Sequence, residues 1–191
     1  MALVAFAGSR SLAGREVENL VRSLVGSVVR AGRQIAVGCA VGADQMALEA
    51  ALANGAKPTV FAAFGSDGYG SWKGSAVATV RKAARTLENS GGKIHWWAGG
   101  GRFVPLTQRL SRRTLAMVAE VAASGPGNGL VAFLTPDSKG TLLTIREAVR
   151  LEVPVVVFLV AGAQLPTVQG GSWQPAGKGV WQSGFRFVPG Q

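Results

Sequence analysis

The sequence contains only one cysteine and one histidine, Cys39 and His95. One cysteine excludes an internal disulfide, and these two residues leave no Cys/His cluster of the kind that holds structural zinc. We therefore expect no bound metal and no resident cofactor. The longest apolar run, 153–163, is too short to span a bilayer and contains a proline. The N-terminal stretch also lacks the basic leader of a secretory signal. These absences predict a cytoplasmic protein without membrane contact.

Acidic residues are also scarce. Ten Asp and Glu residues face twenty Lys and Arg residues, which gives a formal net charge of +10. Nine of the basic residues lie in the window 73–113, where the only acid is Glu88, at Lys73, Arg81, Lys82, Arg85, Lys93, Arg102, Arg109, Arg112 and Arg113. Such a positive segment attracts phosphates, including those of single-stranded nucleic acid. The alternative interpretation is a solvated basic helix face.

Four aromatic residues, Trp72, Trp96, Trp97 and Phe103, lie among the basic residues of that window. Aromatic rings beside cations suit a single strand, because bases stack on the rings while the cations follow the phosphates. The alternative is that the same rings fill the hydrophobic core. Both interpretations stay open at the level of sequence.

Apolar periodicity predicts strands at 3–6, 34–37, 59–64, 93–97, 129–134 and 153–160. Helices are expected between them, over about 17–28, 43–53, 76–87, 106–123 and 140–151, with Leu115, Val118, Ala119 and Ala122 facing inward on the fourth. Alternating strands and helices with short links indicate parallel strands. The fold class is therefore α/β: a doubly wound, mostly parallel, Rossmann-like three-layer sheet.

We divide the chain into a domain over 1–162, with an irregular basic insertion at 65–104, and a Gly/Trp-rich appendage over 163–191. The appendage has alternating aromatic residues around a glycine pair, a pattern that favours a short hairpin or a tail. Its role is not indicated by the sequence.

Three glycine-bearing turns follow three of the predicted strands. In a doubly wound fold, ligands bind beyond the carboxyl ends of the strands, where helix N-termini present free N–H groups to anions. We therefore expect a phosphate of a nucleotide-like ligand at these turns. The candidate residues are Gly8, Ser9, Arg10, Gly38, Gly42, Ala43, Asp44, Ser138, Lys139, Gly140, Thr141 and Thr144, with Arg113 from the long helix. Neither a Walker A pattern nor G-x-G-x-x-G follows any strand.

These turns, in this order, resemble the SLOG superfamily, which joins the DprA/Smf DNA-processing proteins to the Lonely-guy (LOG) phosphoribohydrolases. The resemblance is carried by "VAFAGSR" at the start, "VGCAVGADQMALEAALANGAKPTVF" (37–61), "RTLAM" (113–117) and "PDSKGTLLT" (136–144). The last of these aligns with the LOG signature P-G-G-x-G-T-x-x-E. The resemblance covers roughly residues 2–160 and implies a homodimer.

The resemblance to LOG proteins implies cleavage of an N-glycosidic bond, with Arg113 at the position of the family's catalytic arginine. The catalytic glutamate of the signature is replaced by Thr144, and threonine cannot do the work of a carboxylate. Glu147, one helical turn further on, is the candidate substitute. The resemblance to DprA implies binding of single-stranded DNA instead.

Three functions are therefore carried forward. The first is a nucleotide-binding protein, in which Asp44 either stabilises its helix or bonds a ribose hydroxyl. The second is a nucleoside-monophosphate phosphoribohydrolase that uses Arg113 and Glu147. The third is a protein that binds single-stranded nucleic acid through residues 73–113.

Overall fold

The computed structural model describes residues 1–70, 85, 87–88 and 92–190. The first part of the chain and its middle contain, in order, β1 (Leu3–Gly8), α1 (Arg15–Arg30), β2 (Gln34–Gly38), α2 (Ala43–Ala53), β3 (Thr59–Phe61), β4 (Lys93–His95), α4 (Leu106–Ala123) and β5 (Gly129–Leu134). After them come α5 (Lys139–Arg150), β6 (Val155–Leu159), β7 (Gly171–Pro175), the short 3-10 helix η1 (Gly179–Trp181) and β8 (Gly184–Pro189). The helix predicted over 76–87 lies largely outside the described residues.

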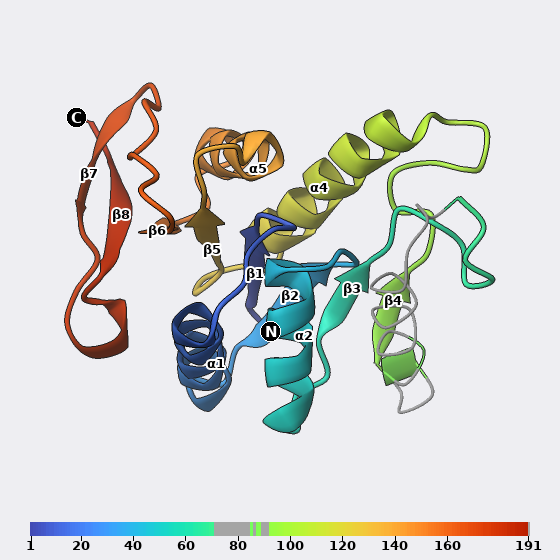
Figure 1. The fold of residues 1–191 in the computed structure, drawn as a ribbon, viewed down its shortest axis with the longest axis horizontal. Helices are drawn as coiled ribbons and strands as arrows, with labels where there is room; N and C mark the ends of the chain where they lie inside the picture. The colour runs from blue at the N-terminus through green and yellow to red at the C-terminus, as the bar shows by residue number, and fades with distance from the viewer. Residues whose placement is uncertain (71–84, 86, 89–91, 191) are drawn as a thin grey trace.

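All eight strands form one sheet in the order β4-β3-β2-β1-β5-β6-β8-β7. The strands from β4 to β6 pair in parallel. The chain builds outward from β1 to β4 and then returns, through α4, to place β5 on the other side of β1 (Figure 1). The strand order therefore reverses between β1 and β5, which is where such folds bind ligands. The predicted doubly wound α/β fold is confirmed.

Helices cover both faces of the central strands, so that β1, β3 and β5 are buried almost throughout. Val4 and Phe6 of β1 join the core beneath α1 and α2, whereas Leu3, Ala5 and Ala7 join the core beneath α4 and α5. This alternation follows from the two-residue period of a strand. Figure 1 shows α1 and α2 together on one side and α4 and α5 on the other. The arrangement explains the continuous apolar runs that the sequence shows at each parallel strand.

The C-terminal tail forms a hairpin that extends the main sheet. Strand β8 pairs antiparallel with β6, with Val157 opposite Phe185, and β7 pairs with the outer side of β8. The hairpin contributes aromatic residues to both layers: Trp181 packs with the core under α1, and Trp173 packs with the core under α5. The predicted aromatic hairpin is thus confirmed, and its partner is the β6 edge (Figure 1).

The inward face of α4 agrees in part with the predicted one. Val118 is buried and Ala122 packs against the core, whereas Ala119 is exposed. The buried face also includes Arg109 and Arg113, together with Met117 and Val121, because both arginines find polar partners inside the protein. Within the described part of the chain, no helix combines the length and the apolarity needed to cross a membrane.

Candidate functional site

A cavity of about 530 Å³ opens at the carboxyl edge of the sheet, beside the reversal between β1 and β5. The turn after β1, the start of α2, one face of α4 and the N-terminal turns of α5 form its walls. Its lining comprises Ala7, Gly8, Ser9, Arg10, Ser11, Ala40, Asp44, Leu110, Ser111, Arg113, Thr114, Met117, Asp137, Ser138, Lys139, Gly140, Thr141, Leu143 and Thr144. Residues from all three predicted turns therefore meet in one place.

Two glycines allow the first two turns to touch. A Cβ added at Gly8 would lie 2.7 Å from the Cβ of Ala43, closer than two carbon atoms can approach. Gly42 has a φ of +80°, and a Cβ there would collide with the carbonyl oxygen of Ser9. The Ala43 N–H in turn donates to that carbonyl at 3.4 Å. Gly42 and Ala43 therefore support the wall of the cavity without lining it, and glycine is needed at both contacts.

The N-terminal turn of α5 forms the third wall. The Gly140 and Thr141 N–H groups occupy the second and third helical positions, where an α-helix has no acceptor for them. The space beside Gly140 is open, with no atom within 4 Å of an added Cβ. The Ser138 hydroxyl is engaged within the turn, where it accepts from the Thr135 N–H at 3.0 Å. The free amides and the positive end of the helix dipole suit an anion.

Thr144 lines the cavity, but its hydroxyl is hydrogen-bonded within its own helix. Thr144 Oγ1 donates to the Gly140 carbonyl at 2.9 Å, and the residue is buried. Glu147 does not line the cavity. Its carboxylate forms two hydrogen bonds with Arg150, at 2.8 and 2.6 Å, and this partner lowers the pKa of Glu147. The structure therefore does not bring the candidate substitute glutamate to the site.

A buried ion pair forms the floor of the cavity. Arg113 Nη1 donates to Asp44 Oδ2 at 3.1 Å, and the two residues are only 8% and 7% exposed. Gly38 lies directly behind them, since an added Cβ would overlap both side chains. Burial raises the pKa of Asp44, while Arg113 and the Ala40 backbone N–H act in the opposite direction. Among the described residues, the buried Arg113 Nε has no acceptor.

The rim of the cavity carries three exposed charges, Arg10, Lys139 and Asp137. Two hydroxyls stand beside Arg10, since the Ser9 and Ser11 Oγ atoms lie 2.7 Å apart in a hydrogen bond. The cavity thus combines free amides, hydroxyls and cations with apolar surface from Leu110, Met117 and Leu143. This arrangement fits a ligand with an anionic group and a less polar body.

Sequence reasoning missed most of the α4 wall, namely Leu110, Ser111, Thr114 and Met117. The helical spacing could have identified two of them. Residues three and four apart share a helix face, so Leu110 and Met117 follow from the position of Arg113. Ser11 follows similarly from Ser9, because the two belong to one turn.

The basic window 73–113 does not form a uniform cationic surface over its described residues. Lys93 pairs with Glu120 at 2.6 Å, and Arg85 Nε donates to the Ser66 carbonyl at 3.1 Å. Arg109 and Arg113 are buried, whereas Arg112 is exposed and Arg102 lies over the Phe103 ring at 4.9 Å. Trp72, Lys73, Arg81 and Lys82 fall outside the described residues.

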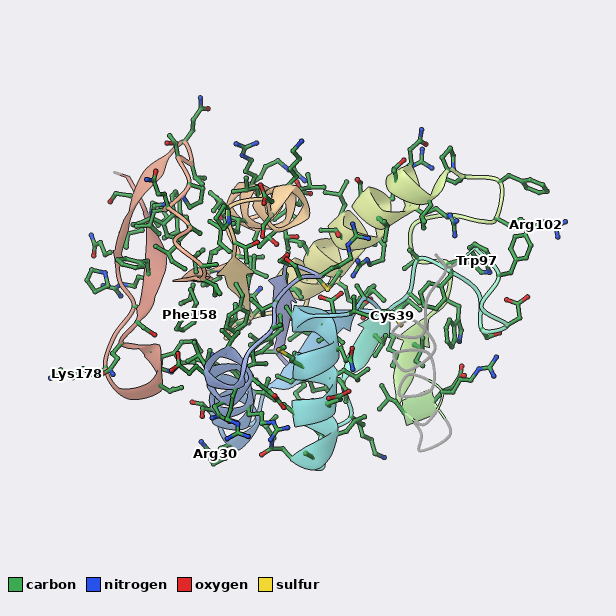
Figure 2. The ribbon with its side chains drawn as sticks, in the orientation of Figure 1. Arg30, Cys39, Trp97, Arg102, Phe158 and Lys178 are labelled. Atoms are coloured by element: carbon green, nitrogen blue, oxygen red, sulfur yellow. The ribbon has the colours of Figure 1, made fainter. Side chains whose placement is uncertain are left out.

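The aromatic residues of the window divide between interior and surface. Trp96 packs on Phe64 and donates to Glu88 at 2.9 Å, and Trp97 lies against Tyr69. Phe103 is 88% exposed. Figure 2 shows Trp97 and Arg102 at the end of the molecule opposite Lys178 of the tail.

The sequence matches no protein-family model, and no curated protein is significantly similar to it in sequence. Solved structures are similar in fold. DNA processing protein A from Streptococcus pneumoniae is 19% identical, with a TM-score of 0.58 over 86% of this chain and 52% of its own. DNA processing protein A from Helicobacter pylori, described for its single-stranded DNA binding mode, is 17% identical, with a TM-score of 0.61 over 83% of this chain and 64% of its own.

A third structure, that of TM1055, is 13% identical, with a TM-score of 0.51 over 81% of this chain and 72% of its own. The chain spans between half and two thirds of the length of the two DNA processing proteins. At these identities the likeness concerns the fold alone, and it agrees with the doubly wound α/β fold that the sequence predicts.

Proposed function

We propose that this protein, which shares the fold of the DNA processing A proteins, binds a nucleotide or nucleotide derivative in the cavity at the β1/β5 reversal. The observation that carries the proposal is the convergence of the β1 turn and the α5 N-terminus on one cavity that also contains Arg113. Its volume of about 530 Å³ lies within the range of small-molecule sites.

The phosphate is expected at the α5 end of the cavity. There the Gly140 and Thr141 N–H groups act as donors, and Lys139 and Arg10 supply positive charge from the rim. The sugar and base are then expected along the apolar lining residues, Leu110 and Met117 of α4 and Leu143 of α5. A homodimer and a cytoplasmic location remain expectations from the resemblance and the composition.

Gly140 allows a test of the phosphate position that leaves the fold intact. Because no atom lies within 4 Å of its added Cβ, both Gly140→Asp and Gly140→Ala fit sterically. The aspartate places a negative charge beside the amides and should weaken nucleotide affinity by about tenfold or more. The alanine should change it much less. Calorimetry with a nucleotide panel measures both, and the absence of heat with every wild-type titration contradicts the proposal.

Binding is proposed in preference to cleavage because of the state of the carboxylates. Thr144 stands where the resemblance requires glutamate, and Glu147 is outside the cavity. Of the two carboxylates that line the cavity, Asp44 is hydrogen-bonded to Arg113 and Asp137 is exposed at the rim. Chromatography for free base after incubation with adenosine monophosphate separates the two functions. Release of base that depends on Glu147 or Asp44 would establish the phosphoribohydrolase instead.

Single-stranded nucleic acid is the second candidate ligand, and one observation on this chain favours it. Phe103 is 88% exposed, with the Arg102 guanidinium over its ring, so the pair offers a stacking surface beside a cation. Oligonucleotide binding should weaken steeply with added salt, because neutralised phosphates release counterions. Phe103→Ala should reduce it by about tenfold, the scale of one lost stacking contact. A flat salt response would exclude this candidate.

A further inference from the structure

Exposed aromatic rings gather in one loop cluster beside the N-terminus of α4. Three large hydrophobic side chains are exposed in the described part of the chain, and two of them are Phe103, at 88%, and Tyr69, at 58%. Arg102 lies over the Phe103 ring, with its guanidinium carbon 4.9 Å from the ring centre. We call Tyr69, Arg102 and Phe103 the aromatic platform. Exposed rings beside a cation suit the stacking of nucleobases.

A single buried arginine holds both loops of the platform. Arg109 donates to the carbonyls of Gly70 and Val104, each at 2.9 Å. Gly70 directly follows Tyr69 in the chain, and Val104 directly follows Phe103. One guanidinium therefore fixes the two ring-bearing loops against α4. A surface that is fixed before binding loses little conformational freedom when a ligand stacks on it.

The platform and the cavity lie at the same edge of the sheet. The loops that bear Tyr69 and Phe103 follow β3 and β4, and the cavity turns follow β1 and β5. These strands pair in parallel within one sheet, so all four loops leave its carboxyl edge. Helix α4 joins the two regions (Figure 1). It begins at Leu106, and Leu110, one turn or about 6 Å further along the axis, already lines the cavity.

We propose that the cavity and the aromatic platform form one site for the end of a single nucleic acid strand. The terminal phosphate lies in the cavity, and the neighbouring bases stack on the platform. This extended site rests on the proposed function, because it joins the nucleotide cavity to the strand-binding surface. It names the ligand more narrowly, as a strand end that carries a phosphate.

The charge of the cavity favours a terminal phosphate over an internal linkage. Three basic side chains line it, those of Arg10, Arg113 and Lys139, against two acidic ones, those of Asp44 and Asp137. The cations therefore outnumber the acids whatever the protonation of the two carboxyl groups. The N-terminus of α5 adds the positive end of its dipole. A terminal phosphate carries up to two negative charges and three free oxygens, whereas an internal linkage carries one charge and two free oxygens.

Thr141 supplies a donor that is independent of the helix terminus. It is only 4% exposed and lines the cavity, and its hydroxyl has no hydrogen-bond partner among the described residues. Other hydroxyls of this wall are engaged, since Thr144 donates to the Gly140 carbonyl and Ser138 accepts from the Thr135 N–H. Buried residues seldom leave a polar group unpaired, so a ligand that accepts from Thr141 accounts for this one. A terminal phosphate has one oxygen for each of three donors, the Gly140 and Thr141 amides and the Thr141 hydroxyl.

Oligothymidylates of about eight nucleotides test the recognition of a strand end. They carry a 5′-phosphate, a 3′-phosphate or neither, and thymidine 5′-monophosphate represents the isolated nucleotide. Competition against a fluorescent octamer measures all four affinities. One phosphorylated octamer should bind about tenfold more tightly than both the unphosphorylated octamer and the mononucleotide, because two linked contacts reinforce each other. The end whose phosphate gives the gain sets the polarity of the strand.

Variants at the two ends of the site separate its parts. Gly140→Asp should remove the gain from the terminal phosphate, so that all octamers bind alike. Gly140→Ala should keep the gain, since no atom lies within 4 Å of a Cβ added there. Phe103→Ala should weaken every octamer by about tenfold, the scale of one lost stacking contact, without changing the affinity for thymidine 5′-monophosphate.

Thr107 tests whether the two parts are continuous. It is exposed in the first turn of α4 and shares a helix face with Leu110 and Ser111, which line the cavity. Thr107→Glu places a negative charge between platform and cavity and should weaken the phosphorylated octamer about fivefold. Ala119→Glu is the matched control, because it adds the same charge at an exposed position of α4 that does not line the cavity. It should leave octamer binding unchanged.

A terminal phosphate that adds nothing to octamer affinity overturns the inference, and so does a gain that survives Gly140→Asp. In either case, binding of thymidine 5′-monophosphate leaves the proposed function standing. Octamers that bind no more tightly than the mononucleotide overturn it as well, since the platform then contributes nothing. Equal losses in Thr107→Glu and Ala119→Glu contradict a continuous site. If neither the octamers nor the mononucleotide bind, both the inference and the proposed function fail.

Discussion

Two buried arginines on α4, four residues apart, differ in their hydrogen-bond partners: Arg109 binds backbone carbonyls, whereas Arg113 binds a carboxylate. Arg109 is 5% exposed and donates to three backbone carbonyls, those of Ala63 at 2.5 Å, Gly70 at 2.9 Å and Val104 at 2.9 Å. Its guanidinium also lies 5.1 Å from the centre of the Trp97 ring. Arg113 is 8% exposed, donates to Asp44, and faces the cavity.

The difference shows how one helix can both fix a structure and form a site. Arg109 uses its donors on the loops after β3 and β4, so it holds those loops against α4. Arg113 has its charge balanced by an acid, and its buried Nε has no acceptor among the described residues. A buried arginine saturated by carbonyls is structural, whereas Arg113 has a single carboxylate partner and lines the cavity, so it can contact a ligand there.

Removing Arg109 should have the largest effect. Arg109→Ala leaves three carbonyls without their donor and opens space beside Trp97. We expect the free energy of unfolding to fall by about 4 kcal/mol, since bonds to a charged donor contribute 1.5–3 kcal/mol each and part of the loss is recovered by water. Chemical denaturation measures the change.

Arg109→Lys provides the control, because it keeps the charge but cannot reach three carbonyls with a planar fork. It should recover less than half of the lost stability. A full recovery, or a loss in Arg109→Ala below about 1 kcal/mol, would contradict the structural role given to the guanidinium.

Removing Arg113 should cost less, about 3 kcal/mol at neutral pH, because the carboxylate left behind can escape its burial by taking a proton. Asp44→Asn together with Arg113→Met removes both charges and should restore part of the stability. Denaturation of the single and double variants measures the coupling between them. If the losses in Asp44→Asn and Arg113→Met add up to the loss in the double variant, the buried pair is not coupled.

Gly38, which lies beside Arg113, allows a milder perturbation of the buried pair. A Cβ at Gly38 would overlap the Arg113 guanidinium and the Asp44 carboxylate, so Gly38→Ala must displace the pair. We expect a loss of about 2 kcal/mol in the free energy of unfolding, together with weaker nucleotide binding. Gly129→Ala is the matched strand variant, since its Cβ would make only an ordinary contact of 3.4 Å with the Pro154 carbonyl oxygen. If both substitutions cost the same, the close packing at Gly38 is not significant.

The sequence predicts the parallel part of the fold well because buried strands and amphipathic helices have strong periodic patterns. Helix α4 was placed at its observed bounds, 106–123, and the β1 and α5 turns that line the cavity were singled out by their glycines and hydroxyls. The burial of Val118 on α4 was predicted, but that of Arg109 and Arg113 was not, because a lone arginine does not reveal which distant group will pair with it. Asp44 lies 69 residues away in sequence.

The tail shows the same limitation. Its alternating aromatics predict a hairpin but do not identify the edge that it pairs with. The antiparallel pairing of β8 with β6 depends on a free sheet edge that exists only after the parallel strands have assembled. Local pattern therefore predicts the elements, and long-range pairing decides the burial of Arg109, Arg113 and the tail tryptophans.

The smallest expected effect is a dependence on pH that only the Arg113 site should show. Burial raises the pKa of Asp44, so the folded protein binds this proton more tightly than the unfolded chain. The resulting stabilisation is fully present below the ordinary aspartate pKa and is lost as pH rises through the raised value. Protonation also frees the charge of Arg113, so affinity for an anion should rise as pH falls through the same range.

The methyl ester of adenosine monophosphate suits this measurement because its phosphate does not titrate there. Its affinity should increase about fivefold from the high-pH to the low-pH limit, the scale of one released charge. Asp44→Asn should bind at the low-pH level throughout, because its Arg113 is never neutralised. Arg109 has no acid beside it among its described partners, so Arg109→Lys should keep the wild-type pH dependence. A pH response that persists in Asp44→Asn would assign the titration to another group and remove the distinction between the two arginines.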